Sequence, residues 1–353
     1  MDSSKYIKDV TVNSYKELAD VIRNGDIDLR DNYVFRGLED SSYDLVPSAL
    51  RDKNNKLNNF IGKDFIPSEY IDIKDANKLG IVNNNAELGN VLVERDKTGK
   101  ILNWPGEKVF DSDGEFQVKK ELYVLFKFLN FADRNGLKVT DNVEVRQNIH
   151  NYMQYNPKWW PEDKFMEIMS LAQHYGLPTR LLDWSYDYKS ALYFALKDIV
   201  ETPRDVDGIL WAFNYKVFEN VNNYGPFFNK LRFYRPEYNR NPNLQAQKGL
   251  FTFIVDDVNY LSRDSLDKRI IDEHAGKSEN DDPYWHTGQF SRIANVYVPK
   301  DKFLFYRIKI PKNQKPLFLK ELYADGYSEE YLFPGYDGAI KAMENRVKLE
   351  KLL

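Results

Sequence analysis

Apolar side chains recur at helical spacing in several segments of the first 200 residues. A capping pair formed by Ser14 and Glu17 precedes one such stretch, which predicts a short helix that ends near Gly25. A longer amphipathic stretch predicts a second helix over residues 115–134, with Gly136 as its stop. The apolar face of this helix is expected to contain Leu122, Leu125, Phe126, Leu129 and Phe131.

Three further helices are marked by their end signals. Pro161 opens one helix, which closes at Gly176 because Pro178 prevents its continuation. Asp187 is the expected N-cap of the next helix. A last helix is expected from about Asp337 towards the C-terminus.

Runs of apolar and β-branched residues predict strands, most of them in the second part of the chain. These runs are residues 33–37, 208–213, 250–255 and 302–310. Helices first and strands later is the pattern of an α+β fold, with a helix-rich N-terminal part packed on a mainly antiparallel sheet. Residues 51–114 are rich in Asn and poor in apolar periodicity, so we interpret them as an insertion within a single domain of residues 1–353.

Composition narrows the class of protein. The chain has 353 residues, and 50 Lys and Arg against 54 Asp and Glu give a net charge of −4, which argues against a dedicated nucleic-acid binder. The absence of cysteine excludes disulfides, zinc–thiolate sites and a cysteine nucleophile. The start of the chain lacks a signal peptide and no apolar run is long enough for a membrane span, so we expect a cytoplasmic location and no membrane partner.

Common catalytic and ligand-binding motifs are missing from the sequence. We find no H-E-x-x-H or H-x-H and no dense cluster of acids and histidines, so no metal site is expected. The Walker A sequence, G-x-G-x-x-G and the G-x-S-x-G elbow of Ser hydrolases are also missing.

One long motif is too particular to arise from composition. Residues 172–185 read AQHYGLPTRLLDWS, and residues 191–195 read ALYFA. Together with the tripeptide Phe35-Arg36-Gly37, this block resembles the bacterial FRG-domain family, which is named after that tripeptide. Residues 245–251 (QAQKGLF) and 332–338 (LFPGYDG) also resemble the family pattern. The resemblance runs from about Tyr33 to Ala342, with the insertion as an interruption.

A more distant similarity to ADP-ribosyltransferases implies a split-sheet fold and a mechanism. In that superfamily an early-strand Arg or His binds NAD, an aromatic side chain stacks near the nicotinamide, and a Glu on a late strand supports the reacting ribose. The similarity implies mono-ADP-ribosyl transfer from NAD to a protein or nucleic-acid acceptor, as in a toxin or a phage-defence effector. It assigns Arg36, His174 and Gln247 to catalysis, and NAD binding to Arg36, Gly37, Tyr175, Arg180, Tyr193 and Gln245.

The side chains themselves leave structural alternatives open. The Arg36 guanidinium suits a pyrophosphate, but it could equally form an ion pair within the fold. His174, at a helix C-terminus, could be a general base or could simply be favoured there as a cation. Arg180 could face a phosphate or pair with Asp183, and Tyr193 has the helical spacing of a core residue.

Gln245 and Gln247 are two residues apart, so on an extended segment both amides lie on one face. An amide can orient a ribose hydroxyl, but it lacks the negative charge with which a carboxylate stabilises an oxocarbenium-like centre. Another acid, such as Asp183 or Asp337, would have to supply that charge.

Two rival functions are also compatible with the sequence. One is a non-catalytic module that senses a ligand or partner through the same residues. The other is a nucleic-acid processing factor, suggested by Arg232, Arg235 and Arg240 among aromatic residues.

Overall fold

The computed structural model describes most of the chain. The described residues are 6–23, 28–51, 56–62, 69–72, 90–93, 113–152, 155–221, 230–236, 246–259, 261–275 and 303–353. Contacts between residues divide the chain into two units. The first, here called the sheet unit, comprises Met1–Val46, Leu182–Phe253 and Asp264–Leu353. The second, the helical unit, comprises Pro47–Leu181 and Ile254–Arg263.

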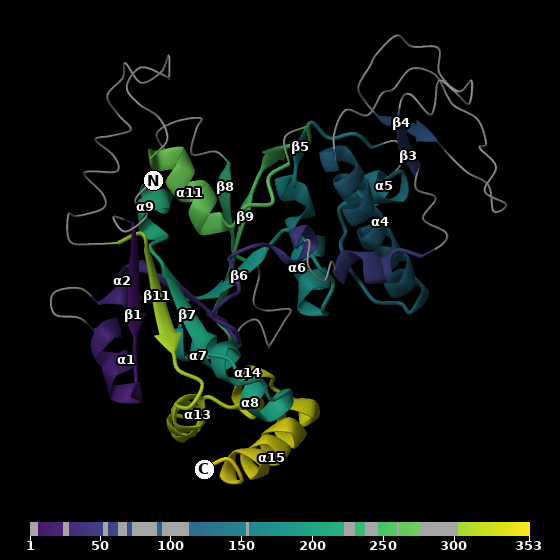
Figure 1. Ribbon diagram of the computed structural model, residues 1–353. Helices are drawn as coiled ribbons and strands as arrows, with labels where there is room; N and C mark the ends of the chain where they lie inside the picture. The colour runs from purple at the N-terminus through teal and green to yellow at the C-terminus, as the bar shows by residue number, and fades with distance from the viewer. Residues whose placement is uncertain are drawn as a thin grey trace. The chain divides into compact units, whose positions relative to one another are not determined.

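The sheet unit is built on a seven-stranded sheet in the order β1-β11-β7-β2-β6-β9-β8 (Figure 1). The strands are β1 (Ile7–Thr11), β2 (Val34–Leu38), β6 (Leu182–Ser185), β7 (Gly208–Phe213), β8 (Leu231–Tyr234), β9 (Gly249–Ile254) and β11 (Phe305–Ile310). β1 runs parallel to β11, whereas the successive pairs from β11 to β9 are antiparallel. The predicted α+β class with a mainly antiparallel sheet is therefore confirmed, and the strands expected in the later half are present.

The sheet unit contains nine helices among the described residues. They are α1 (Tyr15–Ile22), α2 (Leu29–Asn32), α7 (Tyr188–Leu196), α8 (Asp198–Glu201), α9 (Lys216–Val221), α11 (Leu266–Ala275), α13 (Lys315–Ala324), α14 (Glu329–Leu332) and α15 (Tyr336–Glu350). α7 lies against β2, β6 and β7, and α13 contacts α7. Figure 1 shows α13, α14 and α15 gathered near α8.

Local capping explains where two of these helices start. The Ser14 hydroxyl accepts a hydrogen bond from the Glu17 amide at 3.2 Å, and the Glu17 carboxylate accepts one from the Asn13 amide at 2.7 Å. At α7, the Asp187 carboxylate accepts from the Lys189 amide at 3.0 Å. Both predicted caps are confirmed. The Glu17 carboxylate accepts from the backbone amide of Asn13, whereas a capping box would use the amide of Ser14.

The helical unit contains the longest helix of the described chain. Its elements are α4 (Asp113–Arg134), α5 (Val143–His150), α6 (Met166–His174), the 3-10 turns η2 (Ser48–Leu50), η3 (Lys56–Phe60) and η4 (Asp163–Phe165), and the strands β3 (Glu69–Asp72), β4 (Asn90–Val93), β5 (Trp159–Trp160) and β10 (Asp256–Asp257). β3 pairs with β4, and β5 pairs with β10. The helix expected after Pro161 is present, but its first turn is 3-10, and the chain leaves α6 through Gly176 at φ +88°.

The predicted apolar face of α4 is wrong at one residue, Phe131. Leu122, Leu125 and Leu129 are buried as expected, but Phe131 is 56% exposed. The reason is geometric, because two residues past Leu129 is about 200° around the helix and so points away from the core. The Phe131 ring instead lies near the Lys127 ammonium at 5.8 Å.

The described residues contain neither a membrane-spanning helix nor a cluster of metal-binding side chains. No helix in these ranges is long and apolar enough to cross a membrane. Within the same ranges, no group of three or more His, Asp or Glu side chains could hold a metal ion.

Candidate functional site

The FRG tripeptide lies directly against α7. A Cβ placed on Gly37 would stand 1.9 Å from the carbonyl oxygen of Ala191 and 2.7 Å from the amide nitrogen of Ala195. Only glycine permits this approach. Gly37 therefore admits the backbone of another segment, namely the ALYFA helix, to the surface of β2.

The two later motifs meet near the start of the same helix. The Ser185 hydroxyl donates to the Gln247 carbonyl at 2.7 Å. The Gln247 side-chain amide donates to the Leu332 carbonyl at 3.3 Å. The segments QAQKGLF and LFPGYDG, distant in the sequence, are thus joined through Gln247. Gln245 lies outside the described residues.

Arg36 points away from α7, because adjacent strand residues face opposite sides of a sheet and Gly37 faces the helix. Its side chain is 12% exposed. The Nη1 atom donates to the Asp183 carbonyl at 2.7 Å and forms an ion pair with the Asp183 carboxylate, which is 56% exposed. The Nε atom of Arg36 is buried and has no hydrogen-bond partner among the described residues.

A row of paired residues crosses the sheet from Arg36. Arg36 stands opposite Trp211 of β7, Trp211 stands opposite Arg307 of β11, and Arg307 stands opposite Asp9 of β1. Directly paired residues share one face of the sheet. Arg307 donates through Nε and Nη2 to the two Asp9 oxygens at 2.6 and 2.8 Å, and its guanidinium carbon lies 5.8 Å from the centre of the Trp211 ring.

The two arginines beside Trp211 therefore differ in the hydrogen bonding of their Nε atoms. The Nε–Nη2 edge of Arg307 is occupied by a carboxylate, which is the bidentate geometry that arginine prefers. The contacts of Arg36 with Asp183 use Nη1, and its Nε has no partner within the described chain.

Tyr193 is a core residue. It is fully buried, its hydroxyl donates to Glu329 at 3.0 Å, and its ring contacts Phe333 at 6.1 Å. Burial raises the pKa of Tyr193 far above its usual value. Glu329 also accepts hydrogen bonds from Tyr323 at 2.8 Å and from Asn345 at 2.7 Å. The core-packing alternative fits this position, since the Tyr193 ring packs against protein side chains.

Arg180 belongs to a buried charged network in the helical unit. Its Nε donates to both Glu121 oxygens at 2.9 and 3.0 Å, and its Nη1 lies 3.7 Å from Asp256. The Trp160 indole donates to Glu121 at 2.7 Å. All four side chains are buried. The sequence contained a signal for Glu121, since this acid follows Gln117 by one turn within the apolar face of α4.

His174 and Tyr175 end α6, also in the helical unit. Burial lowers the pKa of the half-buried His174, which favours the neutral imidazole. The ring centres of the two residues are 5.1 Å apart, and Tyr175 is 71% exposed. The predicted site residues thus fall into two groups. Those in the sheet unit are Arg36, Gly37, Tyr193 and Gln247, and those in the helical unit are His174, Tyr175 and Arg180.

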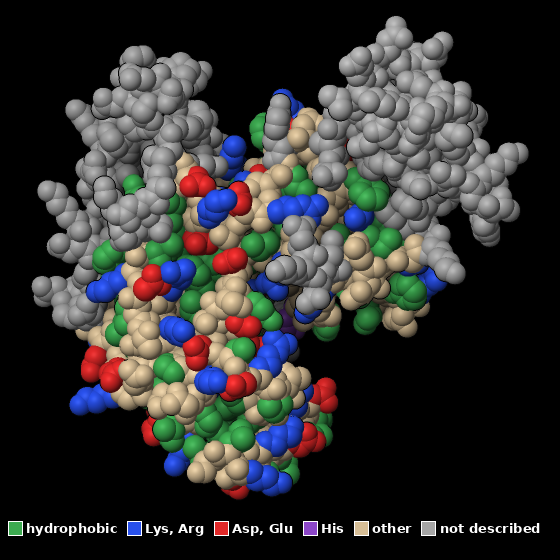
Figure 2. Space-filling model, viewed as in Figure 1, with side chains coloured by type: hydrophobic (Ala, Val, Ile, Leu, Met, Phe, Trp, Pro, Cys, Tyr) green, Lys and Arg blue, Asp and Glu red, His purple; other side chains and the backbone are tan. Residues whose placement is uncertain are grey.

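Acidic and basic side chains lie close to one another elsewhere on the surface (Figure 2). Figure 2 shows acidic and basic groups intermixed on the visible face. In the predicted basic–aromatic patch, Arg235 donates to the Tyr186 hydroxyl at 2.6 Å, and Arg240 lies outside the described residues.

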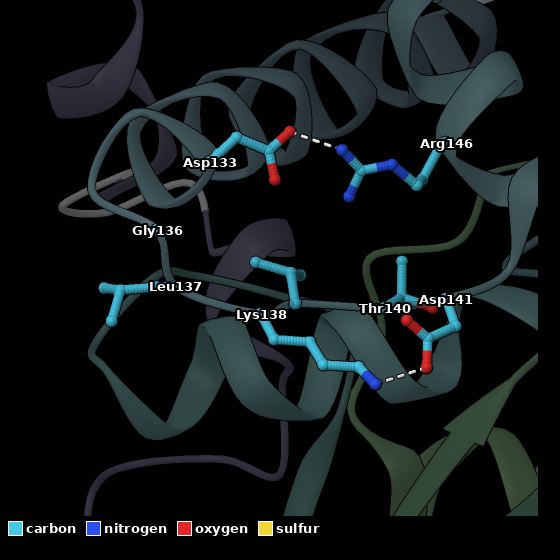
Figure 3. Close-up of a pocket in the computed structure, with 8 residues that line it drawn as sticks. Asp133, Gly136, Leu137, Lys138, Thr140, Asp141 and Arg146 are labelled. Atoms are coloured by element: carbon cyan, nitrogen blue, oxygen red, sulfur yellow. Dashed lines mark hydrogen bonds and ion pairs between the residues drawn. The ribbon is translucent and has the colours of Figure 1, made fainter.

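A hollow of about 380 Å³ lies in the helical unit between the end of α4 and the start of α5 (Figure 3). It is lined by Asp133, Gly136, Leu137, Lys138, Val139, Thr140, Asp141 and Arg146. Its charges pair with each other, Asp133 with Arg146 and Lys138 with Asp141. The predicted site residues do not line it, so the hollow gives no support to the expected chemistry.

Comparison with known proteins identifies a family for part of the chain. Residues 119–203 match the family model of the FRG domain. This segment contains the AQHYGLPTRLLDWS and ALYFA motifs, and the tripeptide of residues 35–37 lies before it. No curated protein and no solved structure matches the chain significantly. The FRG-domain resemblance carried by the motifs is therefore confirmed over residues 119–203.

Proposed function

We propose that the sheet unit binds a nucleotide-type anion at Arg36, with NAD as the specific candidate. The contrast between Arg36 and Arg307 carries this proposal. Two arginines flank one tryptophan on the same sheet face, and Arg307 has its bidentate edge filled by Asp9. Arg36 has a buried Nε without a partner in the described chain.

The position of Asp183 is compatible with ligand binding. A largely buried guanidinium is costly unless a partner compensates its charge. Asp183 supplies only part of this compensation, because its carboxylate is more than half exposed and water screens its charge. By holding Nη1, Asp183 also orients the plane of the guanidinium, so that the opposite edge can meet two phosphate oxygens.

The sharper form of the proposal is mono-ADP-ribosyl transfer, in a toxin or a phage-defence effector. The glycosidic bond between ribose and nicotinamide would break, and the ribose C1′ would bond to an acceptor on a protein or nucleic acid. A carboxylate near the developing positive charge would be required. Asp183 is a candidate for that role, because its carboxylate already contacts Arg36.

The rival form is a non-catalytic module that senses the same ligand. Gln247 favours this form, because its amide carries no charge and already donates to the Leu332 carbonyl. Release of nicotinamide from NAD, measured with the purified protein, separates the two forms. Binding without release supports the sensing module.

Arg36→Lys is the decisive variant, with Arg307→Lys as its matched control. Lysine keeps the charge but loses the bidentate edge. We expect Arg36→Lys to weaken NAD binding about ten- to a hundred-fold in calorimetric titration, with little change in melting temperature. Arg307→Lys should leave the affinity unchanged. Failure of the wild-type protein to bind NAD and ADP-ribose, or a melting temperature many degrees lower for Arg36→Lys, would show that the ligand role is wrong.

A further inference from the structure

Trp211 differs from two other buried tryptophans of the described chain. The Trp184 indole donates to the Thr252 hydroxyl at 2.9 Å, and the Trp160 indole donates to Glu121 at 2.7 Å. The Nε1 of Trp211 is buried and has no hydrogen-bond partner among the described residues, although the side chain is only 2% exposed. A buried indole N–H nearly always has an acceptor, so this one requires an explanation.

The partner of Trp211 across the β2–β7 ladder is Arg36, whose Nε is also buried without a partner. Side chains at directly paired positions lie on the same face, about 5 Å apart at their Cβ atoms. Both groups are donors only, so neither can satisfy the other. A single acceptor atom placed between them would satisfy both, and the guanidinium favours an acceptor that carries negative charge.

We propose that Trp211 is a second ligand-binding residue of the Arg36 site. Its Nε1 donates to an oxygen of a phosphate group that Arg36 also binds. This inference rests on the proposed function and extends it. It adds a neutral hydrogen-bond donor to the site, which contributes no positive charge toward a phosphate.

The charge balance around Trp211 indicates which phosphates fit. The guanidinium groups of Arg36 and Arg307 carry two positive charges. The carboxylates of their ion-pair partners, Asp183 and Asp9, carry two negative charges. Asp267 on α11 and Asp44 also act electrostatically on Arg307. Burial raises the pKa of Asp267 and so favours its neutral form, whereas Asp44 adds a further carboxylate near Arg307. Without a positive surplus, a phosphate with one charge is accommodated better than a dianion. The site therefore fits the singly charged phosphates of a pyrophosphate diester, as in a dinucleotide, better than a terminal phosphate monoester.

Trp211→Phe tests the role of the indole N–H, because it keeps an aromatic ring and removes the donor. ADP-ribose is the probe, with AMP and inorganic phosphate for comparison. We expect the affinity for ADP-ribose to fall about tenfold. The melting temperature should fall less than in Trp184→Phe, because both variants lose ring volume but only Trp184→Phe also removes an existing hydrogen bond. Wild-type protein should bind ADP-ribose more tightly than AMP or inorganic phosphate. Trp184→Phe is the control, and it should lower the melting temperature but leave the affinity unchanged.

The outcomes separate this inference from the proposed function. If Arg36→Lys weakens binding and Trp211→Phe does not, Arg36 remains the ligand residue and Trp211 is excluded. A fall in the melting temperature of Trp211→Phe as large as that of Trp184→Phe, without a change in affinity, would assign the acceptor to a buried water and overturn the inference. Stronger binding of AMP or phosphate than of ADP-ribose would overturn the assigned ligand class. If the wild-type protein binds none of these probes, both proposals are wrong.

A second measurement is needed if Trp211→Phe does not fold. The chain has six tryptophans, so the indole N–H signal of Trp211 can be assigned by exclusion from single substitutions at the other five. In the wild-type protein this signal should shift downfield on titration with ADP-ribose, as the N–H gains an acceptor. An unchanged signal at saturation would refute the contact.

Discussion

Gly37 of β2 and Ala191 of α7 are in such close contact that a Cβ on the glycine would lie 1.9 Å from the alanine carbonyl oxygen. The obstructing atom belongs to a helix backbone, which cannot move aside as a flexible side chain can. The Phe-Arg-Gly tripeptide thus combines a helix-packing position at Gly37 with a polar position at Arg36 on the opposite face of the strand.

Gly37→Ala should therefore lower the free energy of unfolding by about 3 kcal/mol, the upper range for overpacked sites. Denaturant unfolding would measure this loss. Gly136→Asn is the control, because Gly136 has open space around it and asparagine tolerates its φ of +68°. Equal stability of the two variants would mean that β2 and α7 can separate at little cost.

Helix α4 gives a second prediction, from two apolar residues on opposite sides. Leu129 is fully buried, and Leu129→Ala should cost about 2–5 kcal/mol of stability. Phe131 is 56% exposed, so Phe131→Ala should cost less than about 1 kcal/mol. Thermal and denaturant unfolding of both variants would test this orientation, and the reverse order of losses would contradict it.

The buried network of the helical unit gives a third prediction. Glu121→Ala leaves the Arg180 guanidinium buried without its closest carboxylate, and loss of one partner of a buried pair costs about 3–5 kcal/mol. Asp9→Ala breaks the exposed ion pair with Arg307 and should cost at most about 1 kcal/mol. Urea unfolding at neutral pH would compare them. A small loss of stability for Glu121→Ala would indicate that another group, such as Asp256, compensates the charge of Arg180.

The fourth prediction concerns pH. Burial lowers the pKa of His174, so between its folded and unfolded values the unfolded chain binds more protons. The stabilising contribution of the neutral ring is therefore present above the unfolded pKa of about 6.5 and is lost as the pH falls through the folded pKa. The melting temperature should fall less on acidification from about pH 7.5 to 5.5 in His174→Gln than in the wild-type protein. Parallel pH profiles would exclude this role.

Local signals predicted several of the elements, although β1, α5 and α13 were not among those expected. The Ser14 and Asp187 caps, the exit of α6 at Gly176 and the apolar runs of β7 and β11 all depend on residues close in sequence. The order of strands could not be predicted in this way. β1 pairs with β11 from the far end of the chain, and no local pattern records which strands become neighbours.

In the candidate site, too, features that depend on neighbouring residues were predicted, and contacts between distant residues were not. Arg36 was singled out because a strand residue precedes a glycine, and the structure places it beside Asp183. Trp211 was not singled out, because an apolar run gives no sign that one indole N–H lacks an acceptor. The partners of Arg180 were also missed, since Glu121 and Asp256 approach Arg180 only after folding.

The pairing register of β2 with β7 also protects the strand against misalignment. Arg36 stands opposite Trp211, and Gly37 stands opposite Leu210. A slip of one residue turns every side chain of a strand to the other face of its sheet. A slipped β2 would press the guanidinium into the backbone of α7 and would turn Phe35 out of the hydrophobic core. The three residues Phe35, Arg36 and Gly37 are therefore compatible with only one alignment, so the tripeptide disfavours misfolded pairings as well as stabilising the folded one.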